Sequence, residues 1–236
     1  MLFANLRNSL TSDLKPLAYS AFGLFYNGQA TRSASSSTKY MLRNPSPSAP
    51  REVPRPLVIL SAEQWDANSK DGMQDFAAMY AERGYTTLEI DLAPPPPGDQ
   101  CSLGIHRLAR LMIYTDLASH VRLAAIPFPP VIIARAGACI IAQSYVESNP
   151  AYALALIEPP VSNSSCVPNL LPTPIKEFAF EPRFPIAMVS ASNKIREHRI
   201  VREGEREGWV DILEVNDLKG SGALIDIEKW MDSIGV

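Results

Sequence analysis

The chain has 236 residues, 46% hydrophobic and 20% charged, values typical of a globular protein long enough to bury a sizeable core. Its formal net charge of -3 gives no electrostatic reason to expect nucleic acid as a partner. No run of about 18 uncharged apolar residues occurs, so no transmembrane segment is expected. The three cysteines are far apart and show neither metal-ligand spacing nor a disulfide framework, and we expect no metal or cofactor.

The first 50 residues differ in composition from the rest. They contain five basic residues against the single acid Asp13, and they are rich in serine and threonine. A basic, Ser-rich and acid-poor segment is typical of a mitochondrial transit peptide. The alternative is a disordered tail that carries no targeting information. We therefore expect a mitochondrial protein, in the matrix, with the cytoplasm as the alternative location.

Residues 44–56 contain five prolines, which are poorly tolerated inside helices and sheets. An extended linker is expected there. Residues 1–50 are therefore predicted to form a leader or tail, and this segment includes the start of the linker. The rest of the linker is predicted over residues 51–56, and one folded domain is predicted over residues 57–236.

Beyond the linker, short apolar segments alternate with amphipathic ones. The apolar segments predict strands over residues 57–60, 85–92, 131–134, 153–157, 184–189 and 209–215. The amphipathic segments predict helices over residues 71–82, 102–121, 137–147 and 194–207 and from a Ser221 cap onward, with a proline-rich loop or minimal lid over residues 159–183. This alternation predicts an α/β fold, a doubly wound and mostly parallel sheet with helices on both faces.

The central unit, residues 129–150, takes an apolar strand directly into a helix through a turn of small residues. It resembles the α/β-hydrolase fold, whose nucleophile occupies the middle of a G-x-S-x-G pattern at such a turn. In this chain Ala134 and Ala138 take the two glycine places. Ala136 takes the place of the nucleophile, and an alanine methyl group cannot attack a substrate.

The order of the surrounding segments supports the resemblance, which covers about residues 55–236. Residues 57–62 resemble the strand and oxyanion loop, residues 184–194 the strand that presents the acid, and residues 212–224 the strand and loop that carry the histidine. Ser192 or Asn193 stands at the acid place, and Gly220 or Ser221 stands at the histidine place. All three triad positions therefore lack the side chain that the mechanism needs.

The resemblance therefore implies a non-catalytic protein on this fold, a binding or scaffold module with a protein partner or a mitochondrial assembly. The alternative is a hydrolase or acyltransferase with non-standard catalytic residues. The candidates for that role are Cys139 and a serine of the segment 162–165.

Arg135 precedes the elbow tip, and the following helix begins at Gly137, where unpaired N–H groups attract anions. We therefore expect a pocket for a small anionic ligand. The residues expected to line it are Ser61, Ala62, Arg135, Ala136, Gly137, Ser192, Asn193 and Ser221. The alternative is that Arg135 forms an ion pair with Glu158 or Asp91.

The remaining titratable residues have structural interpretations. Asp66, Asp91 and Glu158 lie near strand ends, where carboxylates usually cap turns. The three histidines, His106, His120 and His198, are expected to be surface or capping residues. Cys139 is expected to pack in the core.

Overall fold

The computed structural model describes residues 37–93, 116–126, 128–166, 170 and 176–236. Within these residues a seven-stranded sheet has the order β1-β3-β2-β4-β5-β6-β7. The strands are β1 (Ser37–Arg43), β2 (Val53–Ser61), β3 (Tyr85–Leu92), β4 (Val131–Arg135), β5 (Ala153–Ile157), β6 (Ile186–Ser190) and β7 (Val210–Glu214). The helices are α2 (Met73–Glu82), α4 (Ala138–Val146), α5 (Arg199–Gly204) and α6 (Ser221–Ser233), with 3-10 turns η1 (Ala67–Lys70), η2 (Ser164–Cys166), η3 (Asn193–Glu197) and η4 (Glu205–Glu207).

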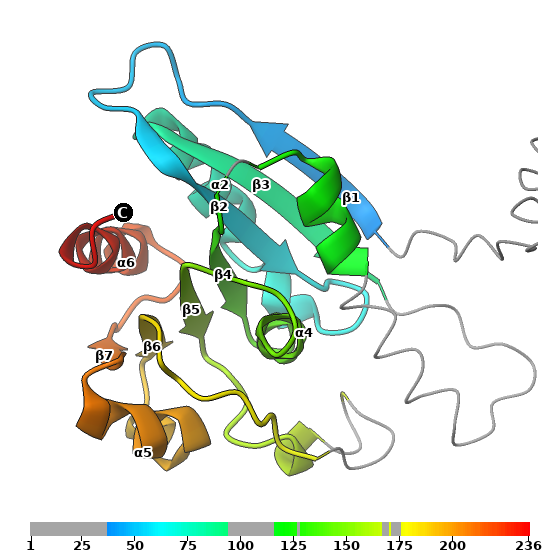
Figure 1. Ribbon diagram of the computed structural model, residues 1–236, viewed down its shortest axis with the longest axis vertical. Coiled ribbons are helices and arrows are strands. Elements are labelled where there is room, and N and C mark those ends of the chain that lie inside the picture. The colour runs from blue at the N-terminus through cyan, green and yellow to red at the C-terminus, as the bar shows by residue number, and fades with distance from the viewer. Residues whose placement is uncertain (1–36, 94–115, 127, 167–169, 171–175) are drawn as a thin grey trace, which may run out of the picture. The chain divides into compact units, whose positions relative to one another are not determined.

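Strand β1 pairs antiparallel with β3, and every other neighbouring pair is parallel (Figure 1). Alternate side chains of the central strands enter two separate cores. Val58 and Leu60 face a core that includes α4, α5 and the helical segment 116–123. Leu57 and Ile59 face a second core that includes α2 and α6. The predicted doubly wound sheet with helices on both faces is therefore confirmed.

The central strands consist almost entirely of buried apolar residues because both of their faces are covered. All five residues are buried in each of β4, β5 and β6. The helix that precedes β3 ends as predicted at Arg83-Gly84. Gly84 has φ of +101°, and a Cβ there would lie 1.8 Å from the carbonyl oxygen of Arg51. Only glycine fits this tight turn into β3.

The folded unit begins earlier than predicted. Residues 37–43, placed in the leader, form strand β1, and residues 53–56, placed in the linker, form the first half of β2. The prolines of this half are tolerated because β2 pairs with β4 only from Leu57 onward. The pairing of β2 with β3 also shifts register between Val53 and Leu57.

Two helix predictions near the C-terminus also need correction. The segment predicted as one charged surface helix over residues 194–207 is divided into η3, α5 and η4, and it buries Ile195, Ile200 and Val201 against the sheet. Ser221 is the first residue of α6, and its expected cap position is taken by Gly220. Ser102, the expected cap of another helix, lies outside the described residues.

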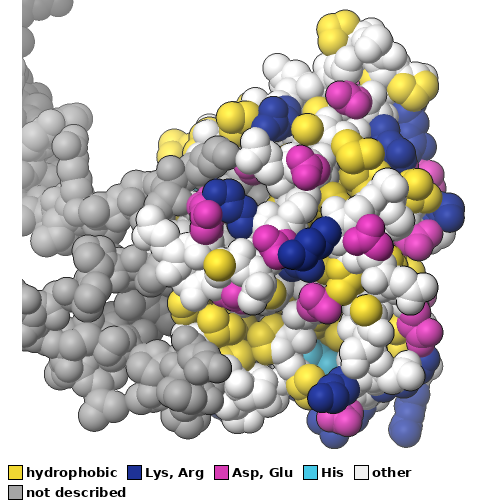
Figure 2. All heavy atoms as spheres, turned by 180° about the vertical axis from the view of Figure 1, so that it is seen from behind, with side chains coloured by type: hydrophobic (Ala, Val, Ile, Leu, Met, Phe, Trp, Pro, Cys, Tyr) yellow, Lys and Arg dark blue, Asp and Glu magenta, His cyan; other side chains and the backbone are white. Residues whose placement is uncertain are grey.

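On the surface, Lys and Arg side chains lie next to Asp and Glu side chains over the face shown in Figure 2, without a large field of one sign. Ion pairs of the described residues include Arg83–Glu228 and Arg51–Asp232. In the described part of the chain, no helix has both the length and the apolar character needed to cross a membrane.

Candidate functional site at the strand-helix elbow

The predicted elbow is present between β4 and α4. Ala136 follows the last residue of β4 and has φ of +48°, and its N–H donates to the carbonyl of Ile157 on the neighbouring strand at 2.8 Å. A left-handed conformation costs an L-residue about 1–2 kcal/mol, and it persists only where the surrounding structure fixes it. The backbone therefore retains the sharp turn that displays a nucleophile in the α/β-hydrolase fold, although the tip is an alanine.

Replacing Ala136 with glycine should raise the free energy of unfolding by about 1 kcal/mol, because glycine adopts positive φ without the steric cost. Urea denaturation measures this change. Ala125→Gly, at a second alanine with φ of +50°, should shift stability in the same direction. Ala138→Gly, in the first turn of α4, should lower stability. A loss of stability in Ala136→Gly would contradict the strained-tip interpretation.

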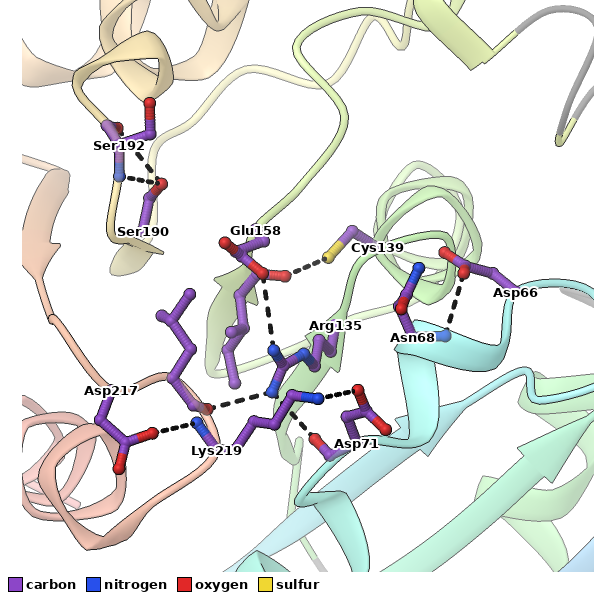
Figure 3. A network of polar contacts seen from close by, with 12 residues as sticks. Asp66, Asn68, Asp71, Arg135, Cys139, Glu158, Ser190, Ser192, Asp217 and Lys219 are labelled. Carbon is purple, nitrogen blue, oxygen red and sulfur yellow. Dashed lines mark hydrogen bonds and ion pairs between the residues drawn. The ribbon is translucent and has the colours of Figure 1, made fainter.

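The N–H group of Gly137, the residue after the tip, already has an acceptor inside the protein. It donates to Oδ2 of Asp66 at 2.8 Å. Oδ1 of the same carboxylate accepts from the N–H of Asn68 at 3.1 Å, the contact of Asp66 that Figure 3 shows. In the α/β-hydrolase fold the N–H at this place binds the oxyanion of the reacting ester. A carboxylate of the chain itself therefore occupies the position of the oxyanion.

The contact between the two segments is close. A Cβ at Gly137 would lie 2.9 Å from Cβ of Asp66, so only glycine allows Asp66 to approach the start of α4. The negative carboxylate also lies at the positive end of the helix dipole, where it stabilises the helix.

The backbone N–H groups at the end of β2, where the second oxyanion donor is expected, also donate to acceptors within the protein. The N–H of Ala62 donates to Oγ of Ser69 at 2.8 Å. Oδ1 of Asp91 accepts from the N–H of Glu63 at 2.9 Å and from Oγ of Ser61 at 3.1 Å. Ser61 is the last residue of β2 and Ala62 follows it, and the described hydrogen bonds hold both within this turn.

Arg135 lies at the centre of a polar network, as Figure 3 shows. Its side chain is 4% exposed, and one terminal nitrogen donates to the backbone carbonyls of Asp71 at 2.9 Å and Leu218 at 3.1 Å. The other lies 3.5 Å from Oε2 of Glu158, a residue that has φ of +49° at the end of β5. This ion pair with Glu158 is the one expected from the sequence as the alternative to an anion-binding role for Arg135. This arginine connects three loops at the carboxyl ends of the strands.

The residues at the acid and histidine places make their hydrogen bonds within their own turns. The N–H of Ser192 donates to Oγ of Ser190 at 3.0 Å, and its own Oγ accepts from the N–H of Lys194 at 3.3 Å. Asn193 is exposed at the start of η3, and Ser221 is exposed at the start of α6. None of these side chains provides a carboxylate or an imidazole at its place.

Cys139 is buried and points away from solvent. Its Sγ lies 3.3 Å from the carbonyl oxygen of Ala134 and 3.6 Å from that of Ile157. Burial raises the pKa of this thiol well above its ordinary value, so the nucleophilic thiolate is disfavoured. The serines of segment 162–165 bond to one another, with Oγ of Ser165 donating to the carbonyl of Ser162 at 2.6 Å.

The two histidines in the described residues have structural surroundings. The ring of His120 lies 5.3 Å from the ring of Tyr40 on β1, which is three strands away from β4 in the sheet. His198 is 4% exposed and its Nδ1 accepts from the N–H of Ile200 at the start of α5. Burial, with a smaller contribution from neighbouring arginines, lowers the pKa of His198 to about 4. His106 lies outside the described residues.

Sequence reasoning identified the carboxylates near the strand ends and the alternative Arg135–Glu158 pair, but not the partners of Asp66. Asp66 was expected to cap a turn, and it caps both η1 and the distant helix α4. The link from Arg135 to the carbonyls of Asp71 and Leu218 carries no sequence signal, because any residue provides a backbone carbonyl.

Comparison with known proteins gives a match by structure alone. No protein-family model matches the chain, and no curated protein sequence matches it. Solved structures with similar folds include a lipase/esterase from Lactobacillus plantarum, at 10% identity and a TM-score of 0.54, with 83% of this chain and 92% of that chain covered. A serine hydrolase without a lid from Xanthomonas campestris has 12% identity and a TM-score of 0.52, with 83% and 86% covered. An α/β hydrolase from Sphaerobacter thermophilus has 9% identity and a TM-score of 0.53, with 82% and 95% covered.

The chain has the α/β-hydrolase fold. At these identities the similarity concerns the fold alone, since one fold hosts many activities. Within the α/β-hydrolase fold, the elbow is the place of the nucleophile, and Ala136 occupies it with the expected backbone conformation.

Proposed function

We propose that this chain is a non-catalytic α/β-hydrolase-fold protein that acts as a binding module for a protein partner. The hydrogen bond from the N–H of Gly137 to Asp66, beside the alanine tip, is the observation that carries the proposal. It fills the oxyanion position with a negative group, which repels the negative charge that ester hydrolysis develops there.

The other parts of the site support the same conclusion. The tip lacks a hydroxyl, and the acid place holds Ser192 or Asn193. An enzyme that uses Cys139 is not favoured, because the thiol is buried and its pKa is raised. The small-anion pocket beside Arg135 stays a prediction. An anion that binds at this helix end has to displace the carboxylate of Asp66, and Arg135 already donates to two carbonyls.

Mitochondrial localisation is part of the proposal and is supported by the composition of the first 50 residues alone. Sequencing the N-terminus of the protein purified from its native cells tests it. A mature N-terminus upstream of β1 supports import and cleavage, and an intact Met1 in a cytosolic fraction contradicts them.

We expect neither the wild-type protein nor the Ala136→Ser variant to hydrolyse p-nitrophenyl acetate above the buffer rate. A fluorophosphonate probe should label neither protein, because a serine at the tip still lacks a base and an open oxyanion site. Ala136→Ser combined with Asp66→Ala removes the blocking carboxylate, and it should remain inactive while losing about 1 kcal/mol of stability with the helix cap.

Labelling of the wild-type chain, followed by mass-spectrometric mapping of the modified residue, is the outcome that overturns the non-catalytic proposal. Circular dichroism of each variant confirms that an inactive protein is a folded one. Heat-denatured wild type provides the control for turnover by exposed side chains.

A further inference from the structure

Strand β7 ends the sheet, and in the described residues it pairs with β6 on one side only. The carbonyl of Trp209 accepts from the N–H of Ile186 at 2.9 Å, and the N–H of Val215 donates to the carbonyl of Ser190 at 3.2 Å. A parallel ladder uses every second residue of a strand. The N–H and C=O groups that point to the open side therefore belong to Val210, Ile212 and Glu214.

A groove runs along this open side, between β7 and α6. Its volume is about 450 Å³, and its walls include the β7 residues Asp211 and Leu213 and the α6 residues Asp226, Lys229 and Trp230. Trp209, which precedes β7 in the chain, is 40% exposed although it does not line the groove. A large exposed apolar side chain beside an edge strand is typical of a surface that binds another chain.

The groove is negatively charged. It is lined by three carboxylates, those of Asp211, Glu214 and Asp226, and by one ammonium group, that of Lys229. Asp211 accepts a hydrogen bond from the indole N–H of Trp230 at 3.0 Å, a neutral donor that leaves its charge in place. Two of these carboxylates have a cationic partner: Asp226 pairs with Lys229 at 3.1 Å, and Glu214 pairs with Arg196 at 3.3 Å. Both pairs lie on the exposed surface, where such a pair contributes little and is screened by salt.

We infer that this groove binds an extended, lysine- or arginine-bearing segment of a partner protein, which adds to the sheet as a strand beside β7. The outward backbone groups of β7 would pair with the backbone of the added strand, and the carboxylates would select its basic side chains. The inference rests on the proposed binding function and specifies its partner by chemistry.

Three synthetic seven-residue peptides test the inference with the full chain. The first alternates lysine with valine, the second has glutamate in place of lysine, and the third is the lysine peptide with proline in place of its central valine. Calorimetry at low salt should give the lysine peptide at least a tenfold lower Kd than either of the others. Amide hydrogen exchange should slow at Val210, Ile212 and Glu214 when the lysine peptide binds.

Two sets of variants separate charge from backbone pairing. The triple variant Asp211→Asn, Glu214→Gln and Asp226→Asn should weaken lysine-peptide binding about tenfold. The matched triple variant Asp75→Asn, Glu82→Gln and Glu181→Gln removes the same charge from exposed sites outside the groove, and it should bind like wild type.

Ile212→Pro removes one outward N–H group and leaves the ladder to β6 intact, so it should abolish binding. Ile212→Val keeps that group and should still bind. If Ile212→Pro fails to fold, the charge variants and the hydrogen exchange of wild type still decide the outcome.

Equal binding of the lysine and glutamate peptides, or binding without slower exchange in β7, overturns the inference. Absence of all binding also overturns it, since the charges then only protect an edge strand from aggregation. These results leave the ester-turnover test unaffected, so the failure of one proposal is distinguishable from the failure of the other.

Discussion

Replacing Arg135 with methionine is expected to lower the free energy of unfolding by about 3 kcal/mol. Methionine fills much of the same volume but donates no hydrogen bond, so the carbonyls of Asp71 and Leu218 lose the donor that now satisfies them. Each unsatisfied buried polar group costs about 1–3 kcal/mol. For a domain of this size, 3 kcal/mol corresponds to a fall in Tm of roughly 6–12 °C.

Two further substitutions make the Arg135 measurement specific. Arg135→Lys keeps the positive charge, but its single ammonium group replaces the two terminal nitrogens that reach the carbonyls and Glu158. It should therefore lower the free energy of unfolding by about half as much as Arg135→Met does. Arg196→Met removes an arginine whose ion pairs are exposed, and it should change stability by less than about 0.5 kcal/mol. If Arg135→Met and Arg196→Met change the free energy of unfolding equally, the polar network around Arg135 does not stabilise the fold.

The stability of the protein should also fall by about 3 kcal/mol between pH 6.5 and pH 4 because of one buried side chain. His198 has a pKa of about 4 in the folded protein, below the value of about 6.5 expected in the unfolded chain. The unfolded state therefore binds a proton first as the pH falls. The contribution of His198 to stability is complete above pH 6.5 and is lost progressively as the pH approaches 4.

The variant His198→Asn isolates this contribution. Asparagine keeps a side-chain acceptor for the N–H of Ile200, so the cap of α5 is preserved, and it does not titrate. The free energy of unfolding of wild type minus that of the variant should fall by about 3 kcal/mol from pH 7 to pH 4. A constant difference across this range would mean that the histidine titrates alike in both states. Carboxylates that titrate below pH 5 affect both proteins and cancel in the comparison.

The sequence predicted those parts of the fold that hydrophobic pattern and turn residues determine. Strands β3 and β5 have the predicted bounds, because each is an apolar run between clear turn signals. Strand β1 was missed because its residues, STKYMLR, follow a long Ser-rich segment and lie at the edge of the sheet, where β-strands need no continuous apolar run. The split of segment 194–207 was missed because its charged residues conceal three buried apolar ones, Ile195, Ile200 and Val201.

At the site, the sequence predicted the strand-helix turn and the residue at its tip, but not the contacts around them. The alanine at the tip follows from alignment to a motif, and its positive φ follows from the strand-helix turn. The role of Asp66 depends on a tertiary contact across 71 positions of the chain, which local patterns do not encode. The same applies to the carbonyl partners of Arg135.

The carboxylate of Asp66 has a consequence for any attempt to install ester hydrolysis at this elbow. Under the proposed non-catalytic function, turnover requires a nucleophile, a histidine, an acid and an open oxyanion site together. Removing Asp66 alone costs a helix cap, and adding a serine alone supplies no base. No single substitution is therefore expected to give measurable turnover, so an enzyme designed on this chain needs several changes at once.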